Sequence, residues 1–395
     1  MKIKTYQNLE VECDLPLDAD PKNLIALPAL VDPHVHFRTP GAEYKENWES
    51  GALAAINGGV TTVFDMPNNT PAITTEVILD EKIKLVNEQL TKINIPLHRY
   101  FYLGATTDNL PEIEKCKNKI IGVKLFMGAS TGNLLVADYE AQKNIFKKCA
   151  ELNLVVAVHA EDDDIINAQK NNFPEATISD HGKIRPNRAA QIAAQKAIHL
   201  ARETGVTLYI LHTSTAQEID LIRQAKKEGI KVFAEVTPHH LFLDETAYGT
   251  LGAKAQMNPP LRSKNDQNAL WEAINDGTID TVGTDHAPHT LQEKSLPYPN
   301  SPSGVPGIET YLPLLLDAHN KGKITLEKIV ELTHTNPLKI FGLEKNNDLV
   351  LVDLNEIRTI KNENLKTKCR WSPFDRWELK GWPKYTILNN KIYKV

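Results

Sequence analysis

The chain has 395 residues, of which 41% are hydrophobic and 24% charged, and its net charge is −5. This length suits one large domain with an appendage or two domains. Positive and negative residues are mixed, without the basic excess that is typical of proteins that bind nucleic acid or anionic membranes. No segment approaches the run of about eighteen apolar residues of a membrane span, and the N-terminus lacks the apolar core of a signal peptide. We therefore expect a cytoplasmic protein without nucleic-acid or membrane partners.

Short hydrophobic and β-branched runs alternate with amphipathic segments along most of the chain. The first run, residues 24–31, leads directly into Asp32–Arg38. Including it, eight strands are predicted, at 24–31, 60–66, 97–105, 120–127, 154–159, 206–212, 230–236 and 279–285. Helices are predicted at 43–59, 74–93, 110–119, 138–153, 187–204, 216–228, 309–320 and 325–333, with an irregular segment at 171–186.

This alternation predicts a (β/α)8 TIM-like barrel. A doubly wound open sheet is the alternative, but no glycine-rich fingerprint follows the first strand. Runs at 348–353 and 385–388 look like strands without helices between them. Together with the N-terminal residues they predict a small β appendage built from both termini, comprising residues 1–27 and 342–395, beside a barrel of residues 28–341.

Residues that could bind a metal recur at the ends of the predicted strands, where barrel enzymes place their chemistry. They are His34, His36, Lys124, His159, His212 and Asp285. For each later histidine alone, a structural role is the better interpretation, but the whole set favours a metal site. Lys124 stands within an apolar strand. It is either a salt-bridged or snorkelling lysine, or a buried amine that adds carbon dioxide to become a bridging carbamate.

Five motifs carry a resemblance to a known family: Asp32–Arg38, Met66–Asn69, Asn258–Arg262, Gly283–His289 and Ser372–Phe374. With them the sequence resembles the amidohydrolase superfamily, and within it the dihydroorotases of pyrimidine biosynthesis. The motifs span nearly the whole chain.

The resemblance implies a binuclear metal centre. His34 and His36 correspond to ligands of the first metal, with Asp285 on its open side, and His159 and His212 to ligands of the second. Carboxylated Lys124 would bridge the two, although some dihydroorotases use an aspartate instead. Two divalent ions would activate a shared water as hydroxide, and Asp285 would shuttle its proton. Zinc is the expected metal, and other divalent ions stay open.

The resemblance also implies a substrate site. Arg38, Asn68 and His289 would bind the substrate carboxylate, and Asn258 and the Pro306–Gly307 backbone would contact its ring. From the residues alone, Asn68 and Asn258 could simply be turn residues beside prolines. His239, His240 and His286 are assigned supporting roles. We expect residues 290–303 to form a lid over the substrate.

The predicted function is reversible hydrolysis of dihydroorotate, with a homodimer as the common state in this family. The nearest alternative is another cyclic amidase, either a hydantoinase (dihydropyrimidinase) or an allantoinase, which would share the metal centre. An alternative from another class is a non-catalytic scaffold. Such a protein typically lacks metal ligands, whereas every ligand position here is filled.

Overall fold

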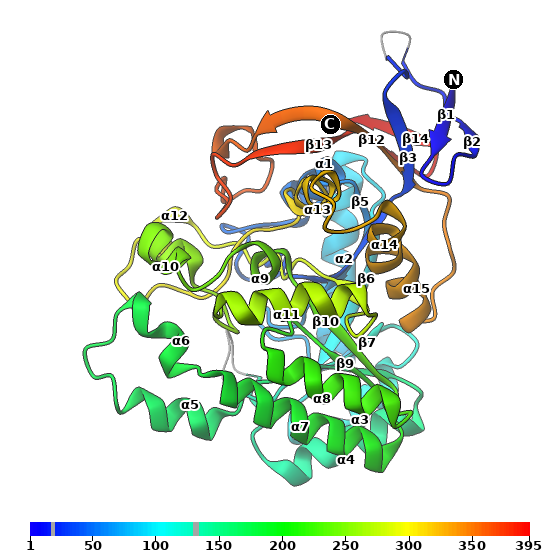
Figure 1. Cartoon of the computed structure of the whole chain (residues 1–395). Coiled ribbons are helices and arrows are strands. Elements are labelled where there is room, and N and C mark those ends of the chain that lie inside the picture. Colours follow the sequence, from blue (N-terminus) through cyan, green and yellow to red (C-terminus); the bar gives the residue numbers. More distant parts are fainter. Residues whose placement is uncertain (17–19, 129–133) are drawn as a thin grey trace.

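The computed structural model describes residues 1–16, 20–128 and 134–395. Its centre is a sheet of eight parallel strands in sequential order, with helices around it (Figure 1). The strands are β4 (Leu30–Val35), β5 (Val60–Asp65), β6 (His98–Gly104), β7 (Gly122–Phe126), β8 (Val155–His159), β9 (Thr207–Ile210), β10 (Val232–Val236) and β11 (Thr281–Val282). A parallel bridge between Val35 and His286 joins the first strand to the chain after the last. The sheet is therefore a nearly closed barrel, as the alternating pattern predicts.

Most of the longer helices follow a strand and return the chain to the start of the next one. They are α1 (Trp48–Asn57), α2 (Glu76–Ile93), α3 (Leu110–Cys116), α4 (Tyr139–Glu151), α7 (Asn187–Thr204), α8 (Ala216–Lys227), α11 (Lys264–Asn275) and α13 (Tyr311–Asn320). Several begin at a side-chain cap; for example, the Thr75 hydroxyl accepts a hydrogen bond from the Ile78 N–H. Of these eight, only α11 lacks a counterpart in the sequence prediction.

Shorter helices fill the connections and are mostly too brief for periodicity to reveal. They are α5 (Asp163–Lys170), α6 (His181–Ile184), α9 (Pro238–Phe242), α10 (Ala247–Leu251), α12 (Leu291–Lys294), α14 (Leu326–Val330), α15 (Asn336–Ile340), and the 3-10 turns η1 (Ile178–Asp180), η2 (Gly252–Ala255) and η4 (Asn362–Asn364). The helix predicted at 325–333 is α14 continued by a π-helical turn, η3 (Glu331–Thr335). Part of the segment predicted as irregular, 171–186, is η1 and α6.

The first hydrophobic run is not one strand, so the prediction for 24–31 is wrong. Residues Leu24–Pro28 form β3, which belongs to a second sheet, and the barrel strand β4 starts only at Leu30. The exchange occurs at Ala29, whose N–H donates to Asp348, while the N–H of Leu30 donates to Gly59. A uniformly hydrophobic run cannot show this division because both of its halves are buried.

The second sheet has six strands from both ends of the chain, in the order β14-β13-β12-β3-β1-β2, and both termini lie beside it (Figure 1). Besides β3, these are β1 (Lys2–Thr5), β2 (Glu10–Glu12), β12 (Leu349–Thr359), β13 (Glu378–Leu388) and β14 (Lys391–Lys394). Its own cluster of buried side chains includes Ile3, Leu24 and Leu351. The division of the chain into two domains stays a prediction.

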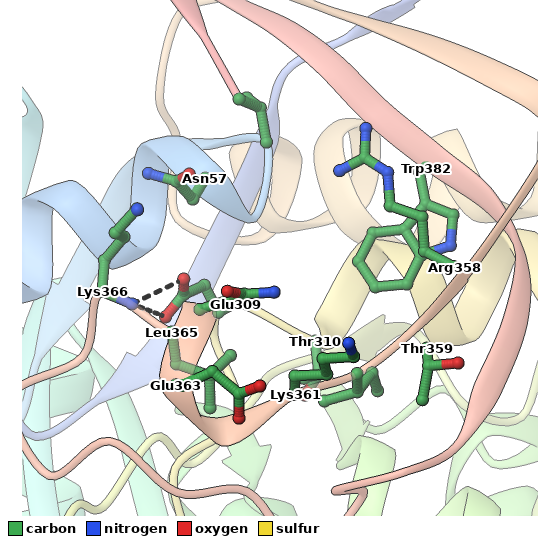
Figure 2. Close-up of a pocket in the computed structure, with 13 residues that line it drawn as sticks. Asn57, Glu309, Thr310, Arg358, Thr359, Lys361, Glu363, Leu365, Lys366 and Trp382 are labelled. Atoms are coloured by element: carbon green, nitrogen blue, oxygen red, sulfur yellow. Dashed lines mark hydrogen bonds between the residues drawn. The ribbon is translucent and has the colours of Figure 1, made fainter.

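The connection between β12 and β13, residues 360–377, reaches from the six-stranded sheet to the barrel. Figure 2 shows the Glu309 carboxylate accepting from the backbone N–H of Lys366, at 2.8 Å. Burial raises the pKa of Glu309 to about 7. Further along, the buried Trp371 indole N–H donates to the His289 carbonyl at 2.7 Å. The C-terminal motif Ser372–Phe374 thus follows a residue that supports the barrel mouth.

Aromatic side chains close the barrel at the end where the strands begin. The Phe341 ring packs edge-on against Phe64, Tyr102 and Tyr209, with ring centroids 5.0, 6.1 and 5.2 Å away. Chemistry is thereby directed to the opposite end, where the strands finish. In the described ranges, each helix is too short or too polar to cross a membrane.

Candidate metal centre and substrate recess

The structure brings the six predicted metal-binding residues together at the C-terminal end of the barrel. All six are buried. His34, Lys124 and His159 belong to β4, β7 and β8, and His36, His212 and Asp285 follow β4, β9 and β11 within a few residues. Parallel strands ending at one rim explain this convergence of residues far apart in sequence.

The first cluster consists of His34, His36 and Asp285. The Nε2 atoms of the two histidines lie 3.2 and 3.0 Å from the same Asp285 oxygen. One potential ligand atom from each residue lies within 4.8 Å of the other two. This is the spacing of groups that share one small cation.

The other nitrogen of each imidazole faces an acceptor. His34 Nδ1 lies 2.8 Å from a Glu235 oxygen, and His36 Nδ1 lies 2.7 Å from the Asn68 side-chain oxygen. With the proton of each ring on Nδ1, donated to that oxygen, each Nε2 lone pair is available to a cation placed beside Asp285. Burial lowers the pKa of His36 to about 3, which keeps the imidazole neutral. Lone pairs and a carboxylate facing one another suit a divalent cation and repel without one.

The second cluster is the pair His159 and His212. His159 Nδ1 lies 2.9 Å from His212 Nε2, and His159 Nε2 lies 3.0 Å from Glu161. Two Arg185 nitrogens bind Glu161 in turn. Burial alone would raise the pKa of Glu161, but Arg185 and His159 outweigh it and hold that pKa below its ordinary value. The His34 and His212 rings, 5.5 Å apart, make the two clusters neighbours.

Lys124 lies between the clusters, and its amine has no ion-pair partner among the described residues. It is 1% exposed, which excludes a snorkelling lysine, and within the described ranges its Nζ has no hydrogen bond or ion pair. The ring of Phe126 lies 4.6 Å away. Burial lowers the pKa of Lys124 to about 7, against the attraction of Asp285 and Glu235. A sizeable fraction of the amine is therefore neutral near pH 7 and able to react as a nucleophile.

Three of the site residues have strained backbones. Arg38, His212 and Asp285 have φ values of 60, 39 and 45°, in the left-handed region that non-glycine residues rarely adopt. Each such residue costs about 1–3 kcal/mol and persists where the surrounding contacts enforce it. Asp285 also explains why β11 ends before the predicted limit of 285, since its conformation leaves the strand.

A recess opens beside the first cluster. It is lined by His36, Arg38, Asn68, Asn258, Asp285, Ala287, Ser303 and Gly304. Arg38 is buried, and its Nε donates to the Pro288 carbonyl at 3.1 Å while Nη2 lies 3.2 Å from His289. Burial, reinforced by Arg38, Lys45 and Lys294, lowers the pKa of His289 well below its ordinary value. The recess therefore has the Arg38 guanidinium and the Asp285 carboxylate in its lining, beside the neutral His289 imidazole.

Other predicted substrate contacts lie differently. The Gly307 N–H already donates to His286 Nδ1 at 3.1 Å, and the recess is lined by Ser303 and Gly304 in place of Pro306 and Gly307. The predicted contact of the Pro306–Gly307 backbone with the substrate ring stays a prediction.

The segment 290–303 is tied down in this structure. The buried Lys294 ammonium donates to the carbonyls of Gln256, Pro302 and Gly304 at 3.1, 2.8 and 3.1 Å. These bonds hold the segment against the recess as a wall. The predicted lid movement stays a prediction.

Sequence reasoning missed the buried acids that orient the site: Glu46, Glu161 and Glu235. Glu46 lies 3.4 Å from His286 Nε2, and the supporting role of His286 stays a prediction. Glu161 follows His159 by two residues and Glu235 lies within β10, where a charged residue in an apolar run was the available signal. His240 contacts Thr237 and the Pro259 carbonyl, at 2.8 and 3.1 Å.

Comparison with known proteins yields a family and several relatives. The amidohydrolase family model matches residues 25–392. A dihydroorotase from Pyrococcus furiosus is 37% identical over 99% of this chain and 86% of its own length. One from Methanosarcina acetivorans is 34% identical over 96% of this chain and 83% of its own length.

Two solved structures that resemble this fold have other names. An L-hydantoinase (dihydropyrimidinase) from Arthrobacter aurescens superposes with a TM-score of 0.89 at 29% identity, covering 93% of this chain and 85% of that one. A dihydropyrimidinase from Brevibacillus agri gives 0.85 at 27% identity, covering 99% and 93%. Fold and sequence thus point to cyclic amidases, with dihydroorotases among the relatives by sequence.

The contact between Glu161 and His159 leads to a test of the second cluster. We expect Glu161→Gln to weaken binding of one of two divalent ions by about 10- to 100-fold, because His159 loses the carboxylate that fixes its tautomer. Metal content measured against increasing chelator checks this. The exposed Glu151→Gln variant is the control, and equal retention of both ions in the two variants would contradict the assignment.

Proposed function

Given that the chain belongs to the amidohydrolase family, we propose that it is a dihydroorotase. It interconverts (S)-dihydroorotate and N-carbamoyl-L-aspartate, a step of de novo pyrimidine biosynthesis. Support comes from the dihydroorotase relatives, which are 34% and 37% identical over nearly the whole chain. The observation that carries the proposal is the buried Arg38 guanidinium in the recess that His36 and Asp285 also line.

The recess suits a small anion on a polar ring. The Arg38 guanidinium offers planar donors that match a carboxylate, and Asn68 and Asn258 line the same recess with amides. The neutral His289 ring adds no charge, and its Nε2 and Nδ1 lie 3.0 Å from the Ser303 carbonyl and 3.1 Å from Lys45 Nζ. Dihydroorotate has a ring carboxylate for these groups, whereas the unsubstituted hydantoin ring has none.

The donor set suits two divalent cations, with zinc expected because nitrogen and oxygen ligands predominate. His34, His36 and Asp285 would hold one, and His159 and His212 the other, with carboxylated Lys124 between them. When bound, the ions lower the pKa of a water and polarise the ring amide carbonyl. The unpaired, partly neutral amine of Lys124 favours the carbamate over a structural lysine.

Asp285 is the proton carrier of the proposed reaction. The Asp285 carboxylate lies 3.2 and 3.0 Å from the Nε2 atoms of His34 and His36, so it stands where a proton carrier for the reaction is needed. It also lines the recess. Asp285 can therefore take a proton from the attacking water and deliver it to the departing amide nitrogen. In the cyclisation direction it carries the proton the other way.

The hydantoinase alternative has an observation of its own, the fold similarity to an L-hydantoinase and a dihydropyrimidinase. An allantoinase would share the same centre. Both alternatives account for the metal cluster but leave the buried Arg38 beside it without a ligand. A homodimer and a cytoplasmic location remain predictions from the sequence.

A variant of Arg38 tests whether the substrate carries a carboxylate. We expect Arg38→Ala to lower kcat/KM for dihydroorotate by about two to three orders of magnitude, because the bound carboxylate would be buried without its counter-charge. Arg202→Ala, at an exposed ion pair, is the control. Steady-state kinetics of both variants measure the effect; unchanged dihydroorotate turnover in Arg38→Ala would refute the assignment.

Lys124 decides how the two ions are held. We expect Lys124→Ala to lose most activity and to bind fewer than two ions per chain, because the bridging anion is gone. Added propionate should restore part of both by supplying a carboxylate in the vacated space. Full metal content and activity without propionate would show that Lys124 is not the bridge.

A further inference from the structure

Helix α2 buries a charge on its apolar face. The buried residues of this helix are Leu79, Lys82, Val86 and Leu90, which recur at the spacing of one helical stripe. Lys82 is 1% exposed, so it occupies a position that periodicity assigns to a hydrophobic side chain. The reaction proposed above does not use it.

The partner of Lys82 is Asp65, the last residue of β5. Its carboxylate lies 2.5 Å from the Lys82 ammonium, and both side chains are 0% exposed. Burying two charges removes both from water, and well-packed apolar residues of similar volume are often as stable as such a pair. Stability is therefore a weak explanation for it, and its other contacts show what it does.

Each member of the pair holds one of two connections at the barrel mouth. The second contact of Asp65 is the backbone N–H of Phe37, at 2.8 Å. Lys82 Nζ donates to the Asn69 side-chain oxygen at 2.8 Å and to the Met66 carbonyl at 3.3 Å. Phe37 immediately precedes Arg38 in the chain, and Asn69 immediately follows Asn68.

These two connections each supply a residue to the lining of the recess. Arg38 and Asn68 both line it, and both belong to the proposed carboxylate-binding group. Arg38 has a strained φ of 60°, so its position depends on how its neighbours are anchored. The ion pair holds both connections, because Asp65 contacts the backbone N–H of Phe37 and Lys82 contacts Met66 and Asn69.

We propose that Lys82 is a positioning residue for recognition of the substrate carboxylate. Through Asp65 and Asn69 it fixes the distance between Arg38 and Asn68, without contacting the substrate. The inference rests on the proposed function, because it takes dihydroorotate as the ligand of the recess. It predicts an effect mainly on KM, since the contacts of Asp285 and of Glu235 with the proposed metal-binding histidines do not involve Lys82, and only the Asn68–His36 contact adjoins a connection that Lys82 holds.

The test separates the role of Lys82 in stability from its role in positioning. Lys82→Met leaves the Asp65 charge buried and unpaired, so we expect the thermal midpoint to fall by about 5 °C or more. In Asp65→Asn/Lys82→Met the charge is removed as well, and the new amide oxygen can still accept from the Phe37 N–H. We expect the midpoint of this double variant to return to within about 3 °C of the parent protein.

If Lys82 positions the two connections, KM of the double variant should stay raised even though its thermal midpoint recovers. In the double variant we expect KM for dihydroorotate about tenfold higher or more, kcat within about threefold, and two metals per chain, because a displacement of about 1 Å weakens oriented binding strongly. Recovery of KM together with the midpoint would overturn the proposal. Lys92→Met, at the exposed ion pair with Glu49 on the same helix, is the matched control.

Two further measurements keep the test decisive. Asn69→Ala removes one acceptor of Lys82 without unpairing a charge, and it should raise KM in the same direction; an unchanged KM would contradict the proposal. Amide exchange of residues 66–70 should be faster in the double variant, and protection equal to the parent protein would overturn the inference. The exchange result holds even if the parent protein does not turn over dihydroorotate, an outcome that would refute the proposed function alone.

Discussion

The site depends on one kind of contact, a buried acceptor behind an imidazole, which three of its four histidines have. Glu235 faces His34, Asn68 faces His36 and Glu161 faces His159, and each can hold the proton of the ring nitrogen next to it. The remaining nitrogens then turn their lone pairs inward, where they suit divalent cations. Because these acceptors come from different strands and connections, the barrel must close before the site can form. The chemistry thus depends on the fold, because the closed barrel brings these buried acceptors behind the imidazoles.

The same logic extends from the metal centre to the recess. Arg38 follows His36 by two residues. One connection therefore supplies both a proposed metal ligand and the residue proposed to bind the substrate carboxylate. Asn68 joins the two functions, since it lines the recess and contacts His36 at 2.7 Å. A cyclic amidase without a substrate carboxylate could keep the first function and lose the second. This explains how similarity to hydantoinases in fold is compatible with a different substrate.

Much of this architecture could be predicted from the sequence because barrel strands are short, β-branched and finish in polar residues. That pattern places His34, His36 and Asp285 at strand ends, and in the structure one potential ligand atom of each lies within 4.8 Å of the other two. The buried acids could not be found in this way, because a glutamate in a sequence usually indicates a solvent-exposed position. The exchange of sheets at Ala29 was hidden inside one hydrophobic run, and the short helices have too few residues to show a period.

The central claim is that this barrel selects a cyclic amide bearing a carboxylate. It is tested most directly by comparing kcat/KM of the metal-loaded protein for dihydroorotate with that for hydantoin and allantoin. The account predicts that dihydroorotate is preferred by at least about 10²-fold, the discrimination expected when a buried cationic group is left unpaired by the competing ring. Equal or faster turnover of hydantoin or allantoin would contradict it.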